Sequence, residues 1–304
     1  VRLVTLRRCP LSLRTRLASL SGGGAGTRRV AAVSDEQDLL HELRDGVAWL
    51  TFNRPDAGNS VTPDQRNRLI DHLDAASADP NVRCVVLTAT GRHFCTGADL
   101  RADRSGGPAR PEGAPERIVG DAMRMIATGA QRLISAILDC EKPVIVGLNG
   151  TAAGLGAHLA LAADLVIAAE GVKLIEVFVR RGIIPDAGGP YLLTKAVGPH
   201  KAKELAFFGD DLLAEDAAAL GIVNKVVPAD ELEATLTDWS GRLAKGPTRA
   251  IATTKWLINR AVDQDRHTAF GEEAMAQEHV MHTHDMGEGV SAFVERRDAE
   301  FKGW

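Results

Sequence analysis

The sequence predicts an α/β fold built around a largely parallel sheet. From Val47 onward, short runs rich in β-branched residues alternate with longer stretches of helical character. Strands that are apolar on both faces and alternate with helices are typical of a parallel sheet that is covered on both sides. The chain has 304 residues and an apolar fraction of 45%, which is enough for one large domain, or one domain with a smaller appendage.

The elements are expected to follow one another in a regular order. We expect strands at the β-branched runs Val47–Phe52, Val82–Thr88, Val144–Leu148, Leu165–Ala168 and Lys225–Val227. We expect helices between them at Pro63–Ala78, Ile118–Leu138 and Leu155–Ala163. The strand signal stops after residue 246, and three further helices are expected at Thr248–Ala261, Gly271–His282 and Gly287–Glu300.

The last of these helices carries an apolar stripe beside a basic face. Its spacing is helical at Val290, Phe293, Val294 and Arg297. Such a stripe needs a partner surface, either on the body of the protein or on a neighbouring subunit. We therefore expect three regions: an N-terminal segment at 1–33, a core at 34–246 and a helical region at 247–304.

Composition separates the N-terminal segment from the rest. Residues 1–33 contain seven arginines, no acidic residue and several clustered glycines. Two interpretations are open: an extension without a fold of its own, in a cytoplasmic protein, or a cleavable transit segment, in a mitochondrial one. Arg101–Glu116, rich in glycine, proline and arginine, is expected to be either a lid or a plain surface loop.

Charge and cysteine usage exclude several classes of protein. The net charge is −4 although the first 33 residues are basic, so the remainder is an acidic body that would repel nucleic acid. No apolar run approaches the roughly 18 residues needed to span a membrane. Four cysteines (Cys9, Cys84, Cys95 and Cys140) lie far apart, which indicates neither a disulfide framework nor a zinc site and suits a reducing compartment.

Two glycine-rich turns, each after an expected strand, are the strongest chemical signal. They are Gly91–Leu100 and Asn149–His158, and the second opens a helix of small residues. The start of a helix offers unpaired N–H groups and a positive dipole end. If the N–H groups of Ala98 and Leu155 converge on one oxygen, they form an oxyanion hole, which for a thioester would stabilise the enolate. Either turn alone is explained equally well by tight packing of a helix on a strand.

Five segments follow one another in a characteristic order: Leu50–Ser60, Phe94–Leu100, Lys142–Ile145 followed by Asn149-Gly150, Gly182–Gly189 and Glu288–Arg297. In this order they resemble the enoyl-CoA hydratase/isomerase (crotonase) superfamily, and the similarity covers the chain from about Val47 to its end. The resemblance implies a spiral of ββα repeats with a C-terminal helical trimerisation region. It also implies trimers or dimers of trimers, and acyl-CoA substrates without a metal or redox cofactor.

The resemblance also assigns roles to individual positions. Ala98 and Leu155 correspond to the oxyanion donors, although the family usually has glycine at the latter. The positions that would line the coenzyme A or the substrate are Ala57, Ala98, Asp99, Leu100, Arg101, Phe178, Phe293 and Arg296. Of these, Phe293 and Arg296 would reach the coenzyme A of a neighbouring subunit, and Arg296 keeps the positive charge of the usual lysine.

The chain departs from the family at both catalytic glutamates. His158 stands at the first position and Phe178 at the second, and a phenylalanine cannot transfer a proton. Three ionisable groups remain nearby. Asp186 resembles the catalytic aspartate of family members that isomerise double bonds, or alternatively caps a helix. His158 is a second catalytic candidate, or a packed polar residue, and Glu176 is expected in an exposed salt bridge.

Several functions remain compatible with these residues. The leading hypothesis is isomerisation of an enoyl-CoA with Asp186 as acid and base. The alternatives are hydration by an Asp186/His158 pair, a thioester hydrolase or dehalogenase with Asp186 as nucleophile, and a binding protein without turnover. A histidine-rich segment, 278–285, could suggest a metal, but it lacks a third well-spaced ligand and is interpreted as a solvated face.

Overall fold

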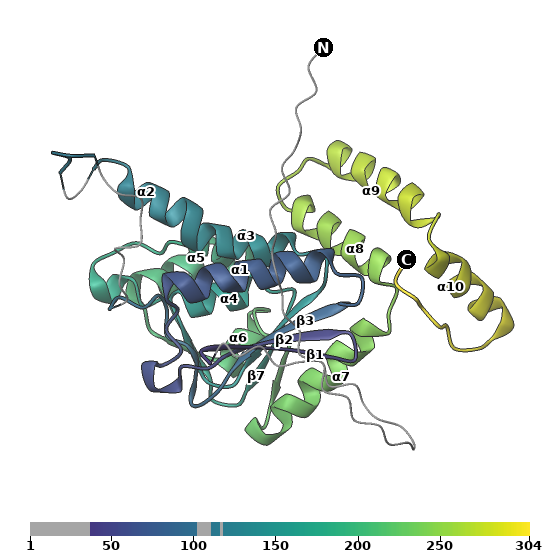
Figure 1. The fold of residues 1–304 in the computed structure, drawn as a ribbon, viewed down its shortest axis with the longest axis horizontal. Coiled ribbons are helices and arrows are strands. Elements are labelled where there is room, and N and C mark those ends of the chain that lie inside the picture. The colour runs from purple at the N-terminus through teal and green to yellow at the C-terminus, as the bar shows by residue number, and fades with distance from the viewer. Residues whose placement is uncertain (1–36, 102–110, 116–117) are drawn as a thin grey trace, which may run out of the picture. The chain divides into compact units, whose positions relative to one another are not determined.

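Figure 1 shows the chain in a computed structural model that describes residues 37–101, 111–115 and 118–304. The segment 1–33 and most of the loop Arg101–Glu116 lie outside the described residues, so both expectations about them stay predictions.

Six strands form the larger sheet, in the order β1-β2-β3-β5-β7-β10. β1 is antiparallel to β2, and every other neighbouring pair is parallel. All five residues of β5 are buried, because helices cover both faces of the sheet. The strands are β1 (Leu39–Arg44), β2 (Val47–Phe52), β3 (Cys84–Ala89), β5 (Val144–Leu148), β7 (Leu165–Ala169) and β10 (Lys225–Val227).

A second, four-stranded sheet has the order β4-β6-β8-β9. Its strands are β4 (His93–Cys95), β6 (Thr151–Ala153), β8 (Lys173–Ile175) and β9 (Asp211–Leu213). A strand of the large sheet is followed by a strand of the small sheet and then by helix in three successive units, which begin with β3, β5 and β7. This repetition confirms the expected spiral of ββα units.

The helices of these units cover the sheets. The first unit ends in α2 (Asp121–Met125), a π-helix (Ile126–Ala130) and α3 (Gln131–Asp139). The second ends in α4 (Leu155–Ala162), and the third in α5 (Gly189–Phe208), which is kinked at Gly198. In Figure 1, α1 (Pro63–Ala78) and α3 lie over one face of the large sheet and α7 (Leu232–Ala244) lies on the other, while α6 (Ala214–Ala219) packs beside β10.

The C-terminal region consists of α8 (Thr248–Ala261), α9 (Arg266–Val280) and α10 (His284–Glu295). The last helix is shorter than the predicted Gly287–Glu300, because Arg296 adopts a left-handed conformation (φ 56°) that ends it. Arg297 therefore lies beyond the helix and off the predicted stripe, and its guanidinium pairs with Glu288 at 2.6 Å. The apolar part of the stripe is exposed: Phe293 retains 85% of its accessible surface.

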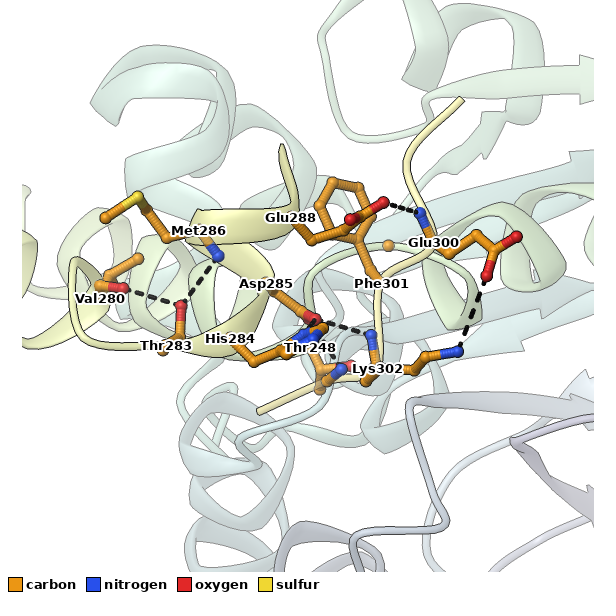
Figure 2. A network of polar contacts seen from close by, with 12 residues as sticks. Thr248, Val280, Thr283, His284, Asp285, Met286, Glu288, Glu300, Phe301 and Lys302 are labelled. Atoms are coloured by element: carbon orange, nitrogen blue, oxygen red, sulfur yellow. Dashed lines mark hydrogen bonds and ion pairs between the residues drawn. The ribbon is translucent and has the colours of Figure 1, made fainter. Parts of the chain in front are cut away.

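A buried aspartate folds the chain end back onto α10 (Figure 2). Asp285 is 3% exposed, and its carboxylate accepts hydrogen bonds from the backbone N–H groups of Lys302 at 2.6 Å and Gly303 at 2.7 Å. Its own N–H donates to the carbonyl of Trp304. The tail is thus fixed by backbone hydrogen bonds to one side chain, which explains why the helix stops early.

A buried ion pair attaches α8 to the core. The Lys255 ammonium lies 2.8 Å from the Asp164 carboxylate and donates to the carbonyl of Ile137 at 2.9 Å. Asp164 also accepts a hydrogen bond from the N–H of Val144, the first residue of β5. Asp164 therefore has a structural role, because it joins α8 to the start of β5. No helix in the described ranges is both long and apolar enough to cross a membrane.

Candidate active site

The two predicted glycine-rich turns lie directly against each other. Their strands, β4 and β6, are paired in the small sheet, with Cys95 opposite Ala152. At Gly156, in the first turn of α4, a Cβ atom would lie 2.1 Å from the carbonyl oxygen of Cys95. At Gly97 a Cβ atom would lie 4.0 Å from the backbone nitrogen of Leu155. Only glycine at position 156 permits this approach of the helix to the strand.

Two backbone N–H groups at this contact are free to bind a ligand. The residues on either side of Ala98 are held by Val61, which donates to the Gly97 carbonyl and accepts from the Asp99 N–H, both at 2.9 Å. Among the hydrogen bonds recorded for the described residues, neither the Ala98 N–H nor the Leu155 N–H has a protein acceptor. Unpaired donors beside a helix N-terminus are suited to an oxyanion.

The loop predicted to face coenzyme A is bound to the first of these turns. Ala57 ends a short 3₁₀ helix (Pro55–Ala57), and the next residue, Gly58, accepts a hydrogen bond from the Thr96 N–H at 3.1 Å. The Arg54 guanidinium pairs with the Asp99 carboxylate at 2.9 Å, partly shielded from solvent. Ala57 and the stretch from Ala98 to Arg101 therefore share one surface, on which Leu100 is exposed.

Asp186 lies in a tight turn just before α5. The turn contains two residues with positive φ, Ala187 (46°) and Gly188 (76°), and the Gly189 N–H closes it by donating to the Asp186 carbonyl at 2.8 Å. The helix begins at Gly189 without a side-chain cap, so the N-cap interpretation of Asp186 is wrong. Burial raises the pKa of the half-buried Asp186 carboxyl, and the nearby His158 opposes that shift.

His158 points into the protein rather than toward solvent. Its ring is fully buried, and Nε2 lies 3.1 Å from both carboxylate oxygens of Glu176. The ring of Phe178 stacks on it, with centroids 5.2 Å apart and planes inclined by 12°. The structure thus brings His158 and Phe178 together next to the turn that carries Asp186.

The expectation of an exposed salt bridge for Glu176 is wrong, because this residue is only 6% exposed. The strand β8 ends at Ile175, so Glu176 and Phe178 do not continue it. The chain instead turns inward after β8 and places the Glu176 carboxylate against α4. The sequence contained a signal for this: one acidic residue stands among Leu174, Ile175, Val177 and Phe178. A charged group in such a run needs a buried partner.

Phe293 and Arg296 are not joined to these loops within the chain. Both are exposed at the end of α10, and no hydrogen bond or ion pair recorded in the described part connects them with Ala57 or Ala98. Their expected contact with the coenzyme A of a neighbouring subunit stays a prediction.

The other reactive side chains are dispersed. Within the described ranges, no group of three or more histidine, cysteine or acidic residues could hold a metal ion, and in the segment 278–285 His282 pairs with Glu278 at 3.2 Å. Cys84, Cys95 and Cys140 are free and buried. Burial raises the pKa of the Cys95 thiol to about 12, so this thiol is protonated and unreactive at neutral pH.

The chain is similar to known proteins along nearly all of its described length. A family model described as enoyl-CoA hydratase/isomerase matches residues 42–304. The chain is 36% identical over 265 residues to the 1,2-epoxyphenylacetyl-CoA isomerase of Escherichia coli K12, covering 87% of this chain and 98% of that protein. It is 34% identical over 268 residues to the crotonyl-CoA hydratase of Syntrophomonas wolfei, with the same coverage. The solved enoyl-CoA hydratase of Bacillus anthracis superposes with a TM-score of 0.79 at 31% identity, covering 88% of this chain and all of that one.

Proposed function

We propose, from the premise that this chain belongs to the enoyl-CoA hydratase/isomerase family, that it moves the double bond of an enoyl-CoA with Asp186 as acid and base. The observation that carries the proposal is the distribution of ionisable groups. Neither position of the family's two glutamates holds a carboxylate, whereas Asp186 is partly exposed in the turn that packs against the first turn of α4.

The proposed reaction is a proton transfer between two carbon atoms. The Asp186 carboxylate removes a proton from C2 of a 3-enoyl thioester, and the electron pair moves onto the thioester oxygen. The N–H groups of Ala98 and Leu155 hold the resulting dienolate, each contributing about 2.7–4 kcal/mol to its stabilisation. Asp186 then returns the proton at C4, which leaves a 2-enoyl thioester and a carboxylate ready for the next cycle.

The raised pKa of Asp186 supports this role. A carboxylate that burial has made more basic is a better proton acceptor. One such group is sufficient for isomerisation because the same proton leaves and returns. Hydration also needs a water molecule to be held and deprotonated, and the second candidate for that task, His158, is buried and bonded to Glu176.

The similarity to an epoxyphenylacetyl-CoA isomerase at 36% identity supports isomerisation of an acyl-CoA as the type of reaction, and the similarity to a hydratase at 34% identity makes hydration the alternative to be tested. We further propose that the chain forms a homotrimer or a hexamer in the cytoplasm. The exposed apolar residues of the C-terminal helices, such as Phe270, Met275 and Phe293, support an interface there.

A paired-substrate assay tests the proposal. The purified protein and Asp186→Asn are each incubated with 3-enoyl- and 2-enoyl-CoA thioesters, and product mass and ultraviolet absorbance are followed. We expect conversion of 3-enoyl to 2-enoyl thioester without a mass change, and its loss in Asp186→Asn by at least about 10²-fold. Addition of water to the 2-enoyl substrate would replace the proposal with hydration. Binding of both substrates without conversion would favour a binding protein.

A further inference from the structure

The hydrogen bond between Glu176 and His158 is buried beside the site and has no part in the proposed reaction. Glu176 follows β8, and His158 lies in α4, so the bond joins two elements of successive repeats. The other ring nitrogen, Nδ1, is buried and has no hydrogen-bond partner in the part of the chain that the structure describes. Glu176 is therefore the residue that orients the ring.

Packing confines the ring on its other sides. Phe178 is stacked nearly parallel to it, as described above. On the α5 side, a Cβ atom at Gly189 would lie 2.3 Å from both Cε1 and Nε2 of the ring, so the backbone of Gly189 rests directly on it. The ring has little room to move as long as the hydrogen bond to Glu176 holds it.

The backbone of Gly189 links the His158 ring directly to Asp186, the proposed base. The N–H of Gly189 donates to the carbonyl of Asp186, and Ala187 between them is fully buried with a left-handed backbone. A turn with two successive positive φ angles persists only where surrounding contacts determine it. On its other side, His158 belongs to the same helical turn as Leu155, whose N–H is one of the two oxyanion donors.

We propose that Glu176 is a positioning residue: its carboxylate fixes the His158 ring, and the fixed ring holds the Asp186 turn at its place against the first turn of α4. This inference rests on the proposed function. It gives His158 an indirect role, because the ring sets the distance between the base and the oxyanion donors and does not touch substrate. The titratable side chains near the ring are Glu176 and Asp186, and Asp210 lines a small cavity together with Glu176.

Three substitutions at one position test the proposal. Glu176→Ala removes the acceptor, Glu176→Met removes it while keeping most of the volume, and Glu176→Gln keeps an acceptor oxygen for the ring N–H. We expect kcat to fall by on the order of 10²-fold in the first two variants, the effect of a base misplaced by about 1 Å. KM should change by less than about threefold, because the surface at Ala57 and Leu100 is untouched, and Glu176→Gln should recover most of kcat.

An isotope effect separates positioning from a loss of folded protein. With 3-enoyl-CoA deuterated at C2, a misplaced base makes proton transfer more rate-limiting, so the isotope effect on kcat should increase in Glu176→Ala and Glu176→Met. A smaller fraction of folded enzyme would lower kcat and leave the isotope effect unchanged. Asp210→Asn is the matched control, because Asp210 borders the same cavity, is exposed and is expected to leave all parameters unaltered.

Two results would overturn the proposal. One is wild-type kcat and isotope effect in both Glu176→Ala and Glu176→Met. The other is a loss in Glu176→Gln as large as in Glu176→Ala, which would mean that the charge matters and the hydrogen bond does not. Absence of isomerisation in the wild type, with both thioesters bound, would instead refute the proposed function and the positioning role together. Wild-type turnover therefore distinguishes the two failures.

Discussion

The close backbone approach of α4 to β4 makes Gly156 an informative position for a small change. In Gly156→Ala, the added Cβ would lie 2.1 Å from the carbonyl oxygen of Cys95 and 2.9 Å from its carbonyl carbon. An ordinary contact between carbon and oxygen is about 3.3 Å or more, so one backbone must move by roughly 1 Å. Neither neighbour can rotate away, because the obstacle is the main chain of a buried strand.

The expected loss combines two opposing effects. Alanine favours a helix over glycine by about 1 kcal/mol, which would stabilise the variant. Overpacking of a close contact destabilises by about 1–3 kcal/mol, and a main-chain obstacle places this substitution at the upper end of that range. We therefore expect a net loss of about 1–2 kcal/mol in unfolding free energy. The shift of α4 also moves the Leu155 N–H relative to that of Ala98, which should lower kcat by on the order of 10²-fold.

Urea unfolding and steady-state kinetics measure both effects at one protein concentration. Gly241→Ala in α7 is the matched control, because nothing lies within 4 Å of a Cβ atom there and its backbone is helical. The control should gain about 0.5–1 kcal/mol from helix propensity and keep full activity. If Gly156→Ala behaved like Gly241→Ala, the close approach of α4 to β4 would not exist in solution, and the reasoning about the oxyanion donors would lose its basis.

Four further predictions concern three side chains. Burial raises the pKa of Asp186, so the related stabilisation is complete below the unfolded pKa and is lost as pH rises through the folded pKa. Asp186→Asn should therefore melt at a higher temperature than the wild type at pH 7, and the difference should vanish below about pH 4; a lower melting temperature at pH 7 would contradict this. In the wild type, the acidic limb of kcat/KM should lie above the ordinary aspartate value of 3.8, and a limb at or below it would exclude Asp186 as the base. Thr62→Ala removes the side chain that caps α1 by accepting a hydrogen bond from the Gln65 N–H at 3.1 Å. Urea unfolding should show that the free energy of unfolding falls by about 1 kcal/mol, and an unchanged value would contradict the role of the cap. Asp285→Ala leaves two backbone N–H groups without their acceptor, so limited proteolysis should release the last residues faster than in the wild type; equal rates would mean that the tail is held by other contacts.

The sequence predicted the buried strands and the capped helices well. The bounds of β2, β5, β10, α1 and α8 agree with prediction. Apolar runs identify β2 and β5, which are almost entirely buried, and Thr62-Pro63 is a clear start for α1. The edge strand β1 was missed, since its residues are mostly half-buried and include Glu42 and Arg44. The strands of the small sheet are only three residues long, which is too short for a periodic signal.

The site shows the same division between local and tertiary information. The glycine turns were predictable because close backbone approaches require glycine wherever they occur. The buried position of Glu176 was not predicted, because its burial depends on His158, which is 18 residues away and in another repeat. Two polar residues in two otherwise apolar segments were the available signal, since each needs a buried partner and each could satisfy the other.

The proposed site separates main-chain groups from side chains. The proposed oxyanion donors are main-chain N–H groups, so their position depends on glycines at the contact between β4 and α4 and not on the side chains of Ala98 or Leu155. The proposed acid–base chemistry depends on separate side chains, which project from the segment after β8 and from the start of α4 and α5. In this chain the carboxylate after β8 has turned inward to bind His158, while the carboxylate at Asp186 remains partly open to the site. If the proposed function holds, a change of reaction on this scaffold would require rearranging side chains around a fixed pair of N–H groups.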